Sequence, residues 1–153
     1  MNKQPTVYSL KFAVKVKGEL YAPYVYSRYI QNEWLNVENV LSECNNGFHF
    51  LKLNDENSIF QYYSELSDRY KLSRYKSSRL KHQLVMMLCG IRGEYYRRPT
   101  TNIFREIKII RYFNINSHDD VIKAMKHLEK NHPNNLLKGN VRKHMPNVRG
   151  FEQ

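Results

Sequence analysis

His49 is the residue whose neighbours in the sequence most suggest chemistry. It stands between Phe48 and Phe50, directly after Gly47 and shortly before a segment with helical periodicity. An imidazole titrates near neutral pH, so a histidine in a pocket can act as a general base or bind a ligand. The same position also suits a side chain packed at a strand-to-helix corner. The packed corner is the simpler interpretation, and a chemical role would need a carboxylate such as Glu106 beside the ring.

The remaining histidines do not form the signature of a metal site. His127 and His132 are five residues apart, so they do not stack on one helix face as an i, i+4 pair of zinc ligands would. His118 is followed by two aspartates, which resembles an acid–base cluster. Ser117 and Asp120, however, occupy positions where helix-capping residues belong. We therefore expect a helix start here and no metal.

Glu106 is an acidic residue within an apolar and basic strand segment. An ion pair with a cation on the neighbouring strand is one interpretation. A catalytic carboxylate is the other. The sequence contains no glycine-rich phosphate-binding loop, no nucleophile elbow and no zinc-protease motif, so we expect no cofactor and favour a protein that is not an enzyme.

Positive charge is concentrated in the middle of the chain. The net charge is +11, and residues 68–111 contain twelve Lys and Arg against three Asp and Glu. Residues 1–67 contain six against seven. A localised basic excess is the usual footprint of a polyanionic partner, and this one exceeds what solubility requires. The alternative is a solvated surface without a partner.

Two segments of this basic region also contain tyrosines, RYKLSRYKSSRLKH and EYYRRP. Cations neutralise phosphates, and each ring that stacks on an unpaired base contributes ~1–3 kcal/mol. The pattern therefore predicts binding to RNA or to single-stranded nucleic acid. The residues we predict to bind are Arg69, Lys71, Arg74, Tyr75, Lys76, Arg79, Lys81, Tyr95, Tyr96, Arg97 and Arg98.

Hydrophobic periodicity predicts an α+β fold, with a mostly antiparallel sheet and two main helices in a single domain at 1–130. The expected strands are 10–16, 20–26, 48–53, 82–91 and 102–113. Helices are expected to start at 54–55 and at 117. We expect a tight reversal at 30–34, a short helix or turn at 37–44, a polar basic segment at 71–81 and a loop at 93–101. The basic segment 131–153 has little periodicity and is expected to be an irregular tail.

Composition indicates an intracellular protein. Cys44 and Cys89 are too few for a disulfide framework or a four-cysteine metal site, which fits a reducing compartment. The most apolar run, 84–89, is far shorter than the ~20 residues that span a bilayer. The first residues alternate apolar with lysine, unlike a signal peptide. We expect a cytoplasmic location and no membrane partner.

The arrangement C-x-x-G-F-H-F at 44–50, followed by IFQYY and later by REIKII, resembles small domains of unknown function in phages and giant viruses. The resemblance covers roughly residues 10–111. It implies a viral setting, in the host cytoplasm, without implying an activity.

The same corner resembles part of the NAD-binding site of ADP-ribosyltransferases, where a glycine–aromatic strand leads into a helix. That resemblance implies that Phe48, His49, Phe50 and Tyr63 would line a nicotinamide pocket and that Glu106 would be the catalytic glutamate. The chain departs from the family because it has no S-T-S stretch and because Phe104 stands where many such enzymes have Gln or Glu.

The first functional hypothesis is a small basic protein of phage or viral type that engages RNA, single-stranded nucleic acid or a nucleoprotein complex, such as a host-defence inhibitor. An ADP-ribosyltransferase-like enzyme, or a degenerate relative that binds a nucleotide, is the second hypothesis. A protein whose basic face binds an acidic protein surface is the third.

Overall fold

Strands make up most of the chain that the computed structural model describes. It describes residues 7–23, 28–36, 48–52, 55–76, 82–97, 101–131, 136 and 150–152, of which 51, 70–76, 94–97, 101 and 150–152 are described by their backbone alone. The elements, in chain order, are β1 Tyr8–Val16, β2 Glu19–Tyr21, β3 Arg28–Tyr29, β4 Trp34–Asn36, β5 Phe48–Leu51, α1 Glu56–Lys76, β6 His82–Arg97, β7 Thr101–Asn114, α2 His118–Asn131 and β8 Gly150–Glu152.

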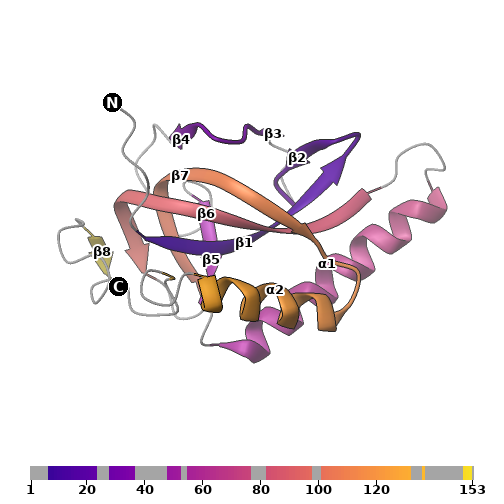
Figure 1. The fold of residues 1–153 in the computed structure, drawn as a ribbon. Coiled ribbons are helices and arrows are strands. Elements are labelled where there is room, and N and C mark those ends of the chain that lie inside the picture. The colour runs from indigo at the N-terminus through magenta and orange to yellow at the C-terminus, as the bar shows by residue number, and fades with distance from the viewer. Residues whose placement is uncertain are drawn as a thin grey trace.

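The strands form one mostly antiparallel sheet in the order β3-β2-β1-β6-β7-β4 (Figure 1). Strand β5 also pairs with β7, antiparallel, and β8 pairs with β6, parallel. The long strands β6 and β7 form its centre, and β1 runs along β6 from residue 82 to residue 90. The described residues therefore have the α+β architecture that periodicity predicts, with two helices on a single sheet.

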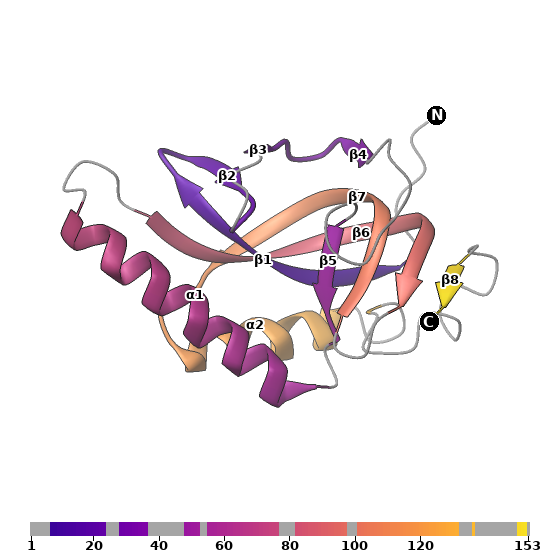
Figure 2. The ribbon, with the colours of Figure 1, turned by 180° about the vertical axis from the view of Figure 1, so that it is seen from behind.

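Each face of the sheet buries its own apolar cluster. The alternating residues Leu10, Phe12, Val14 and Val16 pack with α1 and α2, which cover one face (Figure 2). The second cluster draws on β1, β2, β3, β5, β6 and β7, and none of the helix side chains that the structure describes contributes to it. The sheet therefore curls around this second core, and β1 is buried on both sides. Strand β1 was expected to be half-buried, but Ser9 and Ala13 are almost fully buried on its second face.

Side-chain caps start both helices where the sequence predicts them. The Asp55 carboxylate accepts a hydrogen bond from the Ser58 amide at 3.2 Å, which satisfies one donor at the start of α1. At α2, the Ser117 hydroxyl accepts from the Asp120 amide at 3.2 Å, and Asp120 accepts from the Asn116 amide at 2.8 Å. The cluster around His118 is thus a reciprocal capping arrangement.

The predicted loop at 93–101 is wrong over most of its length. Strand β6 continues to Arg97, and its residues 95–97 pair with residues 102–104 of β7. Gly93, which suggested a loop, has a φ of +84° and lies where the register of β6 shifts. Glycine adopts positive φ readily, so it marks a β-bulge inside the strand here.

Three other expectations differ from the structure. Helix α1 includes residues 71–76, which were expected only to be a polar basic segment. The second strand ends at Tyr21, short of Pro23. Within 131–153, where no regular structure was expected, Gly150–Glu152 forms β8. The expected turn at 37–44 lies outside the described residues.

Candidate functional site

The two basic–aromatic segments lie at opposite ends of the molecule. Arg69, Lys71, Arg74, Tyr75 and Lys76 belong to the last turns of α1, which extend past the start of β6 (Figures 1 and 2). Tyr95, Tyr96 and Arg97 are the last residues of β6. The thirteen residues of strand between His82 and Tyr95 correspond to roughly 43 Å of extended chain. The two predicted clusters are therefore separate surfaces.

The structure describes only part of this predicted set. Arg79, Lys81 and Arg98 lie outside the described residues, and residues 71–76 and 95–97 are placed by backbone alone. Arg69 is exposed on α1. Where β1 and β7 lie beside the first residues of β6, Lys15 Nζ lies 4.9 Å from the centroid of the Tyr112 ring. Arg111 Cζ lies 4.7 Å from the centroid of the Phe113 ring.

A cation and an aromatic ring are in direct contact between β4 and β6. The Arg92 guanidinium lies over the Trp34 ring, 3.8 Å from its centroid. Arg92 also forms an ion pair with Glu106 at 3.2 Å, and the register places Lys108 directly opposite Trp34. We call Trp34, Arg92, Glu106 and Lys108 the tryptophan–arginine surface. Strand β6 continues from it, through the bulge at Gly93, into residues 95–97 of the second predicted cluster.

The ion pair confirms the simpler interpretation of Glu106. Arg92 and Glu106 are direct cross-strand neighbours. The pair is partly exposed, with side-chain exposures of 47% for Arg92 and 22% for Glu106. Such a pair contributes only ~0–1 kcal/mol, so a competing anion can take the guanidinium at little cost. Gly93 makes room for this arrangement, since a Cβ there would lie 2.8 Å from Glu106 Oε2.

Trp34 is held at this surface rather than in a core. It is partly exposed and belongs to neither apolar cluster. Its indole N–H is buried and has no hydrogen-bond partner among the described residues. An unpaired buried donor costs about 1–3 kcal/mol. Neither core packing nor a hydrogen bond of the indole explains the position of Trp34. The contact of its ring with the Arg92 guanidinium does.

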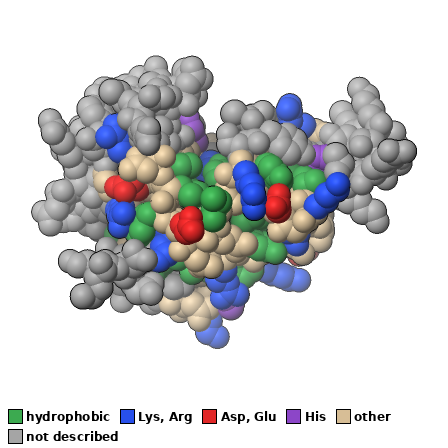
Figure 3. All heavy atoms as spheres, turned by 90° about the horizontal axis from the view of Figure 1, so that it is seen from above, with side chains coloured by type: hydrophobic (Ala, Val, Ile, Leu, Met, Phe, Trp, Pro, Cys, Tyr) green, Lys and Arg blue, Asp and Glu red, His purple; other side chains and the backbone are tan. Residues whose placement is uncertain are grey.

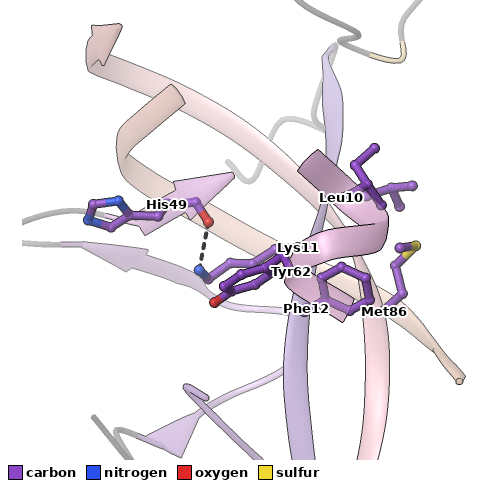
Figure 4. Close-up of a pocket in the computed structure, with 7 residues that line it drawn as sticks. Leu10, Lys11, Phe12, His49, Tyr62 and Met86 are labelled. Atoms are coloured by element: carbon purple, nitrogen blue, oxygen red, sulfur yellow. Dashed lines mark hydrogen bonds between the residues drawn. The ribbon is translucent and has the colours of Figure 1, made fainter. Parts of the chain in front are cut away.

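A small pocket is lined by residues of β1, β5, β6 and α1. Its lining is Leu10, Lys11, Phe12, His49, Ile59, Tyr62 and Met86 (Figure 4). Lys11 Nζ donates to the carbonyl oxygen of His49 at 2.7 Å, and it lies 5.7 Å from the centroid of the Phe50 ring. The His49 imidazole points away from the amine in Figure 4. His49 therefore serves this pocket through its backbone.

Burial perturbs three ionisable groups of the curled sheet. Loss of solvation lowers the pKa of Lys11 to about 8, against an opposing effect of Cys89. Burial raises the pKa of the Cys89 thiol to about 12. Burial, followed by the influence of Cys89 and Tyr62, also raises the pKa of Tyr29 above its usual value. Burial therefore shifts all three groups toward their uncharged forms.

The residues of the ADP-ribosyltransferase resemblance lie in separate places. Phe50 is fully buried in the core of the curled sheet, whereas Tyr63 packs in the core beneath the helices. Glu106 contacts Arg92, and His49 is paired with Ile103 on β7. Among the described residues, these side chains do not line one pocket.

The face that carries β2, β3 and β4 has mixed charge. Figure 3 views this face from above, and Lys and Arg side chains alternate there with Asp and Glu.

Within the described ranges, no three or more His, Cys, Asp or Glu are grouped so that they could hold a metal ion, and no helix has the length and apolarity to cross a membrane. Comparisons with protein-family models, curated proteins and solved structures found no match.

Sequence reasoning missed Trp34, Arg92, Lys108 and Lys11 as members of these sites. Trp34 is the only tryptophan of the chain, which was an available signal. Its partner Arg92 stands 58 positions later, and only the pairing of β4 and β6 with β7 brings the two together.

Proposed function

We propose that this protein binds single-stranded nucleic acid, RNA or DNA, at the tryptophan–arginine surface and along the adjoining residues 95–98. The observation that carries the proposal is the stacking of Arg92 on Trp34 at 3.8 Å. A planar cation on an aromatic ring offers both elements of single-strand recognition, namely a charge for phosphate and a flat surface for a base.

Charge supports the same proposal. Arg92 is half-exposed, and Lys108 stands opposite Trp34 in the register. Arg97 and Arg98 follow within six residues along the chain. With the acids Glu33, Glu94 and Glu106 of the same segments included, these four cations leave a net charge of +1, a small excess in favour of a polyanion. The basic end of α1 lies too far away to belong to the same short site, and it would meet a second part of a longer strand.

Tryptophan fluorescence tests this proposal directly because Trp34 is the only tryptophan. The protein is titrated at low salt with single-stranded oligonucleotides of roughly 12 nucleotides, within the usual site sizes of single-strand binders. We expect quenching of Trp34 and weaker binding as salt increases. Arg92→Gln should weaken binding about tenfold. Arg74→Gln, at the end of α1, is the matched control and should change it little.

Two outcomes would overturn the proposal. Binding that leaves Trp34 fluorescence unchanged and resists Arg92→Gln would move the site elsewhere, to the end of α1 if Arg74→Gln then weakens binding. The absence of nucleic-acid binding at low salt, together with stable co-purification of an acidic protein, would favour the protein-binding hypothesis instead.

Replacement of Glu106 by glutamine should strengthen binding. The substitution removes the carboxylate that pairs with Arg92 and leaves a side chain of the same size. The guanidinium then becomes available to a phosphate. One more phosphate contact makes the slope of log affinity against log salt more negative by about 0.7. We expect a three- to tenfold tighter complex at low salt, measured by the same titration.

Glu65→Gln on α1 provides the matched control, because it changes the net charge equally at a distant exposed position. An equal gain in both variants would show that net charge, and not the Arg92 pair, determines affinity. Glu106→Gln also separates the hypotheses, since an ADP-ribosyltransferase-like enzyme would lose NAD turnover with this substitution.

A further inference from the structure

Lys11 is a half-buried lysine whose amine has an unusual environment. Its Nζ donates to the His49 carbonyl at 2.7 Å and faces the Phe50 ring. No ion pair to a carboxylate holds it among the described residues. The neighbouring thiol, Cys89, is fully buried and stays protonated because its pKa is about 12. No negative charge therefore keeps this lysine protonated.

The amine is consequently a good nucleophile near neutral pH. With a pKa of about 8, about a quarter of Lys11 is uncharged at pH 7.5. An ordinary lysine with a pKa of about 10.4 is uncharged in roughly one molecule in a thousand at this pH. The reactive fraction of Lys11 therefore exceeds that of an ordinary lysine by about two orders of magnitude.

The pocket beside the amine restricts what can reach it. Its volume is about 20 Å³, which is room for one or two molecules the size of water. Most of its lining is apolar, from Leu10, Phe12, Ile59 and Met86. A sugar, a nucleotide or an aromatic aldehyde does not fit. A small, uncharged, electrophilic molecule does fit, and carbon dioxide combines these properties.

We propose that Lys11 is a carbon dioxide site, at which the amine and CO₂ form a reversible carbamate. The Nζ lone pair attacks the carbon of CO₂, one C=O electron pair moves onto oxygen, and one amine proton leaves to water. The balance is Lys–NH₂ + CO₂ giving Lys–NH–COO⁻ + H⁺, with no oxidation or reduction. The inference is independent of nucleic-acid binding.

The pocket can hold the product. The carbamate nitrogen keeps one hydrogen, which can still be donated to the His49 carbonyl. Tyr62 lines the same pocket, and a phenol hydroxyl is a group that can donate a hydrogen bond to a carboxylate. The Lys11 hydrogen bond to His49 connects β1 with β5. Carbamate formation replaces the ammonium cation by an anion at this contact.

Trapping locates the carbamate. The purified protein is incubated with ¹³C-labelled bicarbonate and CO₂ at pH 7.5, alkylated with a trialkyloxonium salt, digested and analysed by mass spectrometry. We expect the trapped carboxylate on Lys11 at an occupancy at least tenfold above that on Lys15, which is four residues along the same strand. A ¹³C carbamate resonance should disappear in Lys11→Arg.

The α-amino group of the chain is an internal reference, because its ordinary pKa of about 7.7–8.0 also permits carbamate formation. Label on the α-amine with none on Lys11 would overturn the proposal, as would equal occupancy of Lys11 and Lys15. Both outcomes are read on the unsubstituted protein, so the test does not depend on the folding of a variant.

Discussion

Replacing Lys11 by methionine should remove the increase in stability that the protein shows between pH 7.5 and pH 9. The amine has a pKa of about 8 in the folded chain and 10.5 as its model value. Between these values the unfolded chain binds more protons than the folded one, so the free energy of unfolding rises with pH. Well below pH 8 both states are protonated, and the cost of burying the charge is fully present.

The expected change can be bounded with the opposing effect of Cys89. Deprotonation of Lys11 contributes about 1 kcal/mol to the free energy of unfolding between pH 7.5 and pH 9. Cys89 acts in the other direction, because its pKa is raised from 9.0 to about 12 and stability falls as the unfolded thiol ionises. Between pH 7.5 and pH 9, the free energy of unfolding of the unsubstituted protein should therefore rise by slightly less than ~1 kcal/mol. Over the same interval, that of Lys11→Met should fall by a few tenths of a kcal/mol.

Denaturant unfolding at several pH values measures this difference. Lys15→Met is the matched control, because Lys15 lies on the same strand and its replacement should leave the rising limb intact. Retention of the rise in Lys11→Met would mean that another group determines the pH dependence. The chemical inference for Lys11 would then lose its supporting ionisation.

Phe50→Ala should be strongly destabilising, whereas His49→Ala should not. Phe50 is fully buried and meets Phe104 edge-to-face, with ring centroids 5.6 Å apart. Truncation of such a ring costs about 3–5 kcal/mol, since it leaves a cavity in a close-packed core. For a chain of this size, that corresponds to a fall in melting temperature of roughly 10 °C.

His49→Ala is the matched control at the next residue of the same strand. Its carbonyl, which accepts from Lys11, is part of the backbone and is retained. We expect a loss below ~1 kcal/mol, as is usual for substitutions away from a core. Thermal unfolding of both variants decides the question. Comparable losses would show that the His49 ring is a structural element in its own right, and Phe50→Leu provides a milder variant if Phe50→Ala does not fold.

Local patterns were sufficient for several features. The cap residues Asp55, Ser117 and Asp120 act through atoms within four residues of themselves, so spacing alone predicted both helix starts. The alternation at residues 10–16 likewise predicted a strand there. The ion pair of Glu106 was predictable in kind, because a lone acid among cations on a strand tends to find a cross-strand partner.

Features that depend on distant strands were not predictable in this way. Gly93 carries the same local signal in a bulge as in a loop, and only the continued pairing of residues 95–97 with β7 distinguishes the two. Lys11 looked like a solvent-facing residue of a half-buried strand. Its burial follows from the curling of the sheet, which brings β5 across β1.

By itself, the sequence determined the fold class, the helix starts and the presence of a strong basic excess between residues 68 and 111. Only the tertiary structure decided that the end of α1 and the end of β6 lie far apart, that Arg92 stacks on Trp34, and that Lys11 is half-buried. The physical reason is range. Propensity, capping and periodicity act over a few residues, whereas strand order and sheet curvature bring together side chains that the chain separates by tens of positions.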